Sequence, residues 1–139
     1  LESFAMPVKT WINDGVRVTF EASGTDFWTP IHTLITRQVQ VRPEIGGAES
    51  DVPLGKVVLL PEEGVDRVTA LKMATTWASE YMLAEDTIGT LEPGKYADFA
   101  VLDKDFFSIP VNEIPNLEVI ATGLSGEVVY GQDQLNSGN

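Results

Sequence analysis

The stretch Ile88–Asp103 is the part of this sequence that most restricts the possible folds. Its centre is Pro93-Gly94, a dipeptide typical of a turn. Lys95 and Ala97-Asp98 then lead into a run of apolar residues that predicts a strand over residues 97–103. After a loop from Phe106 to Asn116, the pattern predicts a hairpin of two further strands, residues 117–122 and 127–130, around a turn at residues 123–126.

Hydrophobic spacing predicts helices and one strand upstream of this stretch. Asp66 has the chemistry of a helix N-cap, and Thr29-Pro30 has that of a helix start. Residues 41–65 are rich in Pro, Gly and acidic residues and are predicted to be a long loop, in which residues 56–60 could pair as a short strand. The remaining predictions are a helix over residues 4–14, a strand over 15–22, a helix over 30–40 and a helix over 66–83.

Length and charge exclude several classes of protein. The chain has 139 residues, fewer than the roughly 250 of a (β/α)8 barrel. Its net charge of -12 argues against partners such as nucleic acid or an anionic membrane, and no apolar run approaches the ~20 residues of a membrane span. The absence of cysteine excludes disulfides and thiolate metal sites. Leu1-Glu2-Ser3-Phe4 suggests a chain entered in the middle of a fold. The sequence does not determine the cellular compartment, and the cytoplasm is favoured over the alternatives.

The order of these elements resembles the C-terminal part of the amidohydrolase superfamily, metal-dependent hydrolases built on a TIM barrel. The specific motif is Pro93 to Asp98, and the closest group is amidohydrolase 3. The resemblance covers roughly residues 7–131, with Asp14–Val18 similar to the entry of the eighth barrel strand and Gly24-Thr25-Asp26 similar to the Gly-Ser-Asp at its end. It implies a mixed α/β fold class. Residues 1–87 would form the last βα unit of an incomplete TIM-like barrel, residues 88–131 strands of the accompanying small β-sandwich, and residues 132–139 a flexible tail.

The resemblance also implies a site. Asp26 would be the catalytic and metal-associated aspartate, which helps to hold a metal-bound water and takes its proton during attack on a carbonyl. The complete protein would use a divalent metal, zinc first, and would hydrolyse a C–N bond of amide type in a small-molecule substrate. The family pattern also needs a His-x-His pair and two further histidines, whereas this chain has His32 alone. We therefore expect the chain by itself to hold no metal and to be inactive.

Simpler interpretations stand beside these. Asp26 could cap a helix, His32 could be an ordinary helix residue rather than a metal ligand, and Asp98 and Asp103 are expected to be turn formers at the ends of a strand. Lys95 is expected to have no catalytic role. The acidic stretch from Glu44 to Asp51 is expected to be a solvated loop, with weak Ca²⁺ binding as the alternative. The tryptophans are expected in a core or interface rather than in a substrate platform: Trp11, Trp28 and Trp77.

A second function class is also compatible with the sequence. A single barrel unit would expose strand edges and apolar helix faces. Such surfaces promote aggregation unless another chain or segment covers them. The chain could therefore be a stand-alone, non-catalytic module that self-associates. Its partners would be further copies of itself, as a homo-oligomer, or the remainder of a barrel. Oligomeric state and metal-dependent activity separate the two classes.

Overall fold

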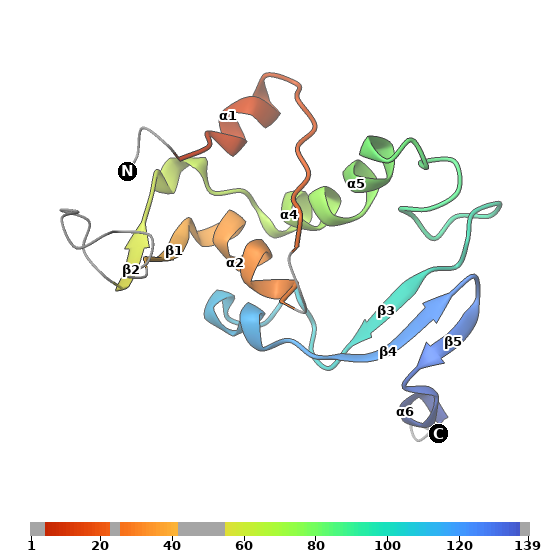
Figure 1. Ribbon diagram of the computed structural model, residues 1–139. Coiled ribbons are helices and arrows are strands. Elements are labelled where there is room, and N and C mark those ends of the chain that lie inside the picture. Colours follow the sequence, from red (N-terminus) through yellow and green to blue (C-terminus); the bar gives the residue numbers. More distant parts are fainter. Residues whose placement is uncertain (1–4, 23–25, 42–54, 137–139) are drawn as a thin grey trace.

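The computed structural model describes residues 5–22, 26–41 and 55–136 (Figure 1). The described part has a mixed α/β fold with two small antiparallel sheets, one of β1 and β2 and one ordered β3-β4-β5, and it contains no closed barrel. This confirms the mixed α/β class. The elements in chain order are α1 (Val8–Asn13), α2 (Trp28–Thr36), β1 (Gln38–Val41), β2 (Gly55–Val58), η2 (Pro61–Glu63), α4 (Arg67–Ala74), α5 (Thr76–Tyr81), β3 (Phe99–Leu102), η3 (Val111–Asn116), β4 (Val119–Leu124), β5 (Glu127–Tyr130) and α6 (Gln132–Asn136).

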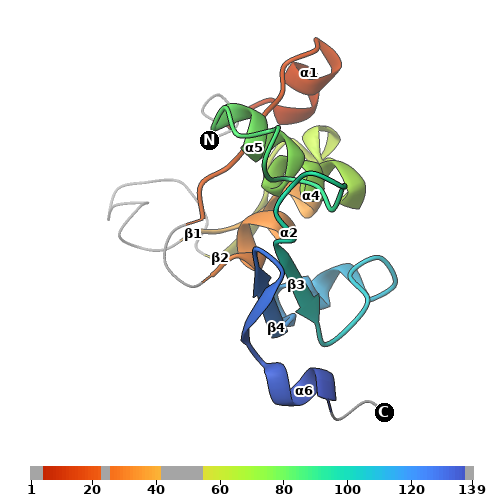
Figure 2. The ribbon, with the colours of Figure 1, turned by 90° about the vertical axis from the view of Figure 1, so that its right-hand side faces the viewer.

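Helix α1 and the three-stranded sheet lie at opposite ends of the molecule (Figures 1 and 2). In both ribbon views α1 lies at one end, α2 and α4 lie in the middle, and β3, β4 and β5 with α6 lie at the other end (Figures 1 and 2). Among the described helices, none is long and apolar enough to cross a membrane.

One hydrophobic core joins the segments before and after residue 88. Ile31 of α2, Met73 of α4 and Ile114 of η3 are fully buried in it. The rings of Trp28 and Phe106 lie 5.9 Å apart at its edge. Trp77 also packs against this core, as expected, whereas Trp11 is exposed. The two predicted parts, 1–87 and 88–131, thus contribute to the same core, and their division into domains stays a prediction.

The strand predicted over residues 15–22 is wrong. Residues 16–22 have no regular secondary structure, and among the described residues they pair with no strand. They lie instead along the helices, where Thr19 Oγ1 donates to the Met73 carbonyl at 2.8 Å and Arg17 pairs with Glu80 of α5. Alternation predicts a half-buried extended segment, and Val18 does pack against the core. A segment becomes a strand only when it pairs with a neighbouring strand, and hydrophobic periodicity does not reveal whether such a partner exists.

The helix predicted over 30–40 begins earlier and ends sooner. α2 starts at Trp28 and stops after Thr36, because Arg37 adopts a left-handed conformation with a φ of 58°. The Arg37 guanidinium is buried and donates to the carbonyls of Leu59 and Met6, which stabilises this conformation. The chain then enters β1, which pairs with β2 in the register Gln38 to Val58. The predicted loop 41–65 therefore contains β2 and η2 in its described part, and residues 42–54 lie outside the described residues.

The helix predicted over 66–83 is divided at Thr75 into α4 and α5. Asp66 caps α4 as predicted, with its Oδ1 accepting from the Thr69 backbone N at 2.9 Å. Thr75 has φ -126° and ψ -89°, which no helix residue adopts. Its hydroxyl donates to the Leu71 carbonyl at 2.8 Å, a local bond that competes with helix geometry.

The C-terminal prediction is closest to the structure. The strand predicted over 97–103 contains β3, and the predicted hairpin is formed by β4 and β5, although β4 extends to Leu124. The loop predicted from Phe106 to Asn116 ends in the 3₁₀ helix η3. Residues 132–136 of the predicted tail form α6, which packs against β4, and the flexibility of the tail stays a prediction.

Candidate functional site

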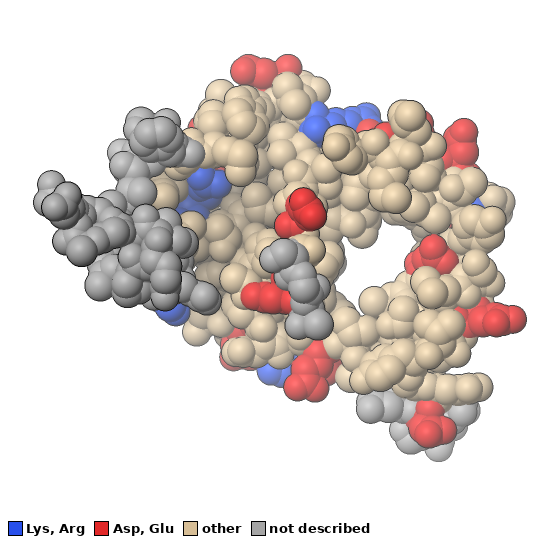
Figure 3. Space-filling model, in the orientation of Figure 1, with Lys and Arg blue, Asp and Glu red and all other residues tan. Residues whose placement is uncertain are grey.

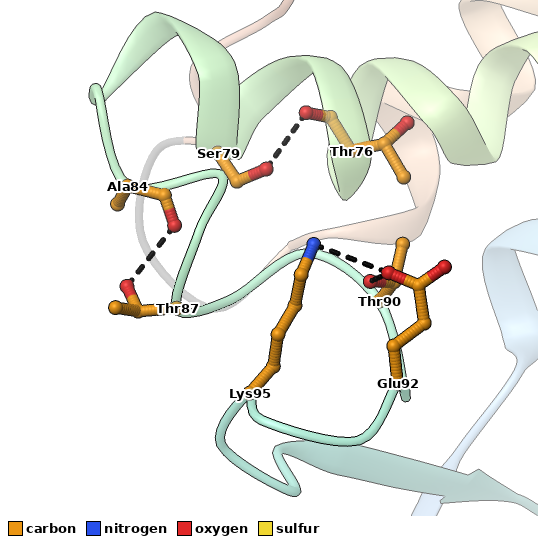
Figure 4. Close-up of polar contacts among 7 residues, drawn as sticks. All are labelled: Thr76, Ser79, Ala84, Thr87, Thr90, Glu92 and Lys95. Carbon is orange, nitrogen blue, oxygen red and sulfur yellow. Dashed lines mark hydrogen bonds and ion pairs between the residues drawn. The ribbon is translucent and has the colours of Figure 1, made fainter.

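The turn that contains Pro93-Gly94 is held by its own side chains (Figure 4). Gly94 has a φ of 97°, and the Lys95 backbone N donates to the Glu92 carbonyl at 3.1 Å. The Glu92 carboxylate accepts from the Thr90 hydroxyl at 2.8 Å and lies 3.4 Å from the Lys95 ammonium. The Thr90 bond, and then Lys95, lower the pKa of Glu92. Lys95 is therefore a structural residue of this turn.

Asp98 and Asp103 stand at the two ends of β3 and tie it to the hairpin. Asp98 Oδ1 accepts from the Ser125 backbone N at 2.8 Å. Asp103 Oδ1 accepts from the Glu118 backbone N at 2.8 Å, and its own backbone N donates to the Glu118 carbonyl. Both carboxylates serve the strand ends, as expected from the sequence.

Asp26 lies two residues before the start of α2 at Trp28 and is exposed to solvent. Its Oδ1 accepts a hydrogen bond from the Thr29 backbone N at 3.0 Å, in the first turn of the helix. Because free N–H groups at a helix start favour a carboxylate, this bond fixes the position of the side chain. The neighbouring Gly24 and Thr25 of the motif lie outside the described residues. The catalytic and metal-binding roles of Asp26 stay predictions.

His32 lies one turn further along α2 and is half-buried. Burial, and then the positive charge of Lys56, lower its pKa from 6.5. The ring borders a cavity of about 210 Å³ between α2, the β1–β2 hairpin and η3. Sequence reasoning considered His32 but missed Lys56, because only the pairing of β2 with β1 brings this lysine near α2. The cavity is lined by Thr29, His32, Thr33, Gln38, Val39, Lys56 and Pro115.

The described residues do not fit a catalytic metal by themselves. Within residues 5–22, 26–41 and 55–136, no three His, Asp or Glu side chains come together as a metal site. Catalytic zinc usually has three protein ligands and a water. Asp26 and His32 would supply two at most. The acidic stretch from Glu44 to Asp51, with its calcium alternative, lies outside the described residues.

Glu63 forms a buried polar contact that the sequence did not indicate. Its side chain is 8% exposed, and its two carboxylate oxygens accept from the Thr10 hydroxyl at 2.5 Å and from the Thr10 backbone N at 2.8 Å. These bonds lower the pKa of Glu63, and the positive charge of Arg37 adds to the effect. The contact joins α1 to η2 across 53 positions in sequence, so no local signal could predict it.

Comparison with known proteins gives the family. No curated protein and no solved structure matches the chain. The model of the amidohydrolase family matches residues 3–130, a range that includes Asp26, the Pro93–Asp98 motif and nearly all of both predicted parts. The predicted resemblance is confirmed, and the family indicates a hydrolase. This chain belongs to the amidohydrolase family.

Proposed function

We propose that the chain is the C-terminal piece of a metal-dependent hydrolase that cleaves an amide-type C–N bond in a small molecule. The observation that carries this proposal is the family match over residues 3–130. In the proposal, residues 1–87 contribute the last βα unit of a TIM-like barrel, and residues 88–131 contribute strands of a small β-sandwich. The two small antiparallel sheets and the absence of a closed barrel in the described part are compatible with this arrangement.

Asp26 is the proposed proton acceptor. Three observations support it: the carboxylate is exposed, it lies two residues before the start of α2, and one of its oxygens is fixed by Thr29 N–H at 3.0 Å. An anchored carboxylate can accept a proton from water that attacks a carbonyl, provided that substrate reaches hydrogen-bond distance. Because the described residues do not supply three metal ligands, we assign no step through a metal to this chain. We propose that the chain alone is inactive.

The first test is an assay of the 139-residue chain with amide substrates in the presence of Zn²⁺, Mn²⁺ or Co²⁺. The proposal expects no metal-dependent hydrolysis. Hydrolysis that a chelator abolishes would show that the chain holds a complete site and would overturn the proposed inactivity. The sequence of the reading frame upstream gives an independent test, since a parent hydrolase requires a His-x-His after a strand there.

Asp26→Asn tests the role of the aspartate in the protein encoded by the complete reading frame. The substitution preserves an acceptor for Thr29 N–H but removes the base, so we expect kcat to fall by roughly 10²–10⁴-fold. Asp14→Asn, in the exposed turn after α1, is the matched control and should retain activity. An unchanged kcat in Asp26→Asn would contradict the catalytic role, and Asp26 would then serve only to cap the helix.

A second candidate function is a self-associating, non-catalytic module. It is favoured by three consecutive apolar side chains that are largely exposed at the end of α5: Tyr81 at 80%, Met82 at 66% and Leu83 at 87%. In the space-filling view, an opening passes between the segment after α5 and the three-stranded sheet (Figure 3). A surface of this kind suits a partner, either another copy or the remainder of a barrel. The oligomeric state of the chain tests this candidate.

A further inference from the structure

The cavity beside His32 has a composition that differs from the rest of the chain. Whereas the chain has 21 acidic and 9 basic residues, no acidic side chain among the described residues lines this cavity. Lys56, in strand β2, is the one cationic residue among the described residues that line it, and His32 lines it from α2. The positive charge of Lys56 is near enough to His32 to lower the pKa of the imidazole. The local field therefore favours an anion in a molecule whose overall charge repels one.

The uncharged lining residues indicate which kind of anion fits. The Thr33 hydroxyl is engaged with the Gln38 carbonyl at 3.1 Å, and the Thr29 hydroxyl belongs to the same side of the cavity. Val39 and Pro115 supply apolar surface. A volume of about 210 Å³ is below the roughly 300–1,000 Å³ of pockets for larger ligands, and so suits a ligand of a few heavy atoms.

We propose that this cavity binds a small aliphatic monocarboxylate, with its carboxylate between Lys56 and His32 and its short chain against Val39 and Pro115. Among the described lining residues, Lys56 alone carries a full positive charge, which matches the single negative charge of a monocarboxylate. An inorganic anion has no apolar part that could contact Val39 and Pro115. The lowered pKa leaves the imidazole neutral at pH 7, so one ring nitrogen can donate a hydrogen bond to the carboxylate. The proposal does not depend on the hydrolase function or on Asp26.

The single histidine makes the experiment specific. Because the 139-residue chain contains one His, its imidazole C–H signals in a proton NMR spectrum report on this cavity alone. Butyrate is titrated at pH 7 and at constant ionic strength, with butyramide as the uncharged probe of similar shape. We expect saturable His32 shifts with butyrate, with a Kd on the order of millimolar, and none with butyramide.

Lysine variants locate the charge that binds. Lys56→Gln is expected to weaken butyrate binding about tenfold, as loss of a charge-assisted hydrogen bond predicts, and Lys56→Arg should retain most of it. Lys56 is exposed, so both variants should keep the spectrum of the folded protein. Lys72→Gln is the matched control, since this lysine is exposed on α4 and does not line the cavity.

Three results would overturn the proposal. They are the absence of saturable shifts with butyrate, equal shifts with butyramide, and unchanged binding in Lys56→Gln. Inorganic phosphate provides a further arm under the same conditions. Phosphate that binds as tightly as butyrate would show that the cavity selects charge alone, and it would contradict the assignment to an aliphatic carboxylate.

Discussion

At the scale of single residues, the Glu63 contact gives a prediction about pH. Its pKa lies below the ordinary value of 4.5 because the folded state presents the Thr10 hydroxyl and backbone N–H to the carboxylate. A lowered folded-state pKa contributes stability that is present above about pH 4.5 and is lost as the pH falls through the folded-state value. We expect Glu63→Gln to lower the Tm at pH 7 and to reduce the loss of stability below pH 4.5.

Glu62→Gln is the control for this prediction. Glu62 occupies the same 3₁₀ helix but is exposed, so its substitution should leave both the Tm at pH 7 and the acid dependence nearly unchanged. Thermal unfolding followed by circular dichroism between pH 3 and 7 measures both. Equal acid dependence in Glu63→Gln and the unsubstituted chain would show that the Thr10 contact is not formed.

The two glycines of the Ile88–Asp103 stretch make a second residue-scale prediction. Both have positive φ, 95° at Gly89 and 97° at Gly94. A Cβ at Gly94 would meet open space, whereas one at Gly89 would collide with Ser79 Oγ, and this hydroxyl already donates to the Thr76 carbonyl (Figure 4). Gly94→Ala should cost about 1–2 kcal/mol of backbone strain, and Gly89→Ala about 1–3 kcal/mol more.

Urea unfolding of the two alanine variants measures this difference directly. Because the backbone strain is similar at the two positions, the comparison isolates the contact with Ser79. Equal losses of stability would mean that α5 and the turn do not approach each other as closely as the structure shows. The result bears on the family motif, since it separates a glycine required by its φ alone from one required also by its neighbour.

At the scale of elements, the start of α4 gives the sharpest prediction. Asp66 accepts from both the backbone N and the hydroxyl of Thr69, at 2.9 Å each. Asp66→Ala removes this cap and should lower the free energy of unfolding by about 1 kcal/mol, whereas Asp66→Asn retains an acceptor and should cost much less. Urea unfolding of the two variants checks this. Asparagine and alanine variants of equal stability would contradict a capping role.

The elements also show what a sequence can predict. Asp66, Pro93-Gly94 and the hairpin turn act through neighbours a few residues away, and each was predicted correctly. Three features were missed: segment 15–22 pairs with no strand in the described part of the chain, α2 ends early at Arg37, and the predicted helix 66–83 is divided at Thr75. Arg37 explains why: its conformation depends on Met6 and Leu59, which are 31 and 22 positions away. Local periodicity carries no information about such partners.

For the candidate sites too, the sequence predicted local contacts and missed those between distant segments. Asp26 was predicted from its motif, and its bond to Thr29 is local. The cavity was not predicted, because His32, Lys56 and Pro115 come from three separate elements. Only the turn at Arg37, the pairing of β1 with β2 and the packing of α2 against η3 bring them together.

At the scale of the whole molecule, the net charge and the exposed apolar surface have opposite effects on self-association. The net charge of -12 repels copies of the chain, and acidic side chains are scattered over the face drawn in Figure 3. The exposed apolar side chains at the end of α5 favour contact between copies. Salt shortens the range of the repulsion, to about 10 Å at 0.1 M and about 3 Å at 1 M, but does not weaken burial of apolar surface. If the chain is a self-associating module, its association should therefore strengthen as salt is added.

Leu83 is the residue to change in testing this. It is 87% exposed and has a φ of 56°, a conformation that asparagine adopts more readily than leucine. Leu83→Asn should thus leave the fold intact while removing apolar surface, and burial of one leucine is worth about 1.5–3 kcal/mol, so the dissociation constant should rise about tenfold or more. Val68→Thr, at a half-exposed position on α4, is the control. Sedimentation equilibrium at 0.1 M and 1 M NaCl measures both effects. A monomer at high concentration in both salts would eliminate the self-associating module and leave the remainder of a barrel as the proposed partner of this surface.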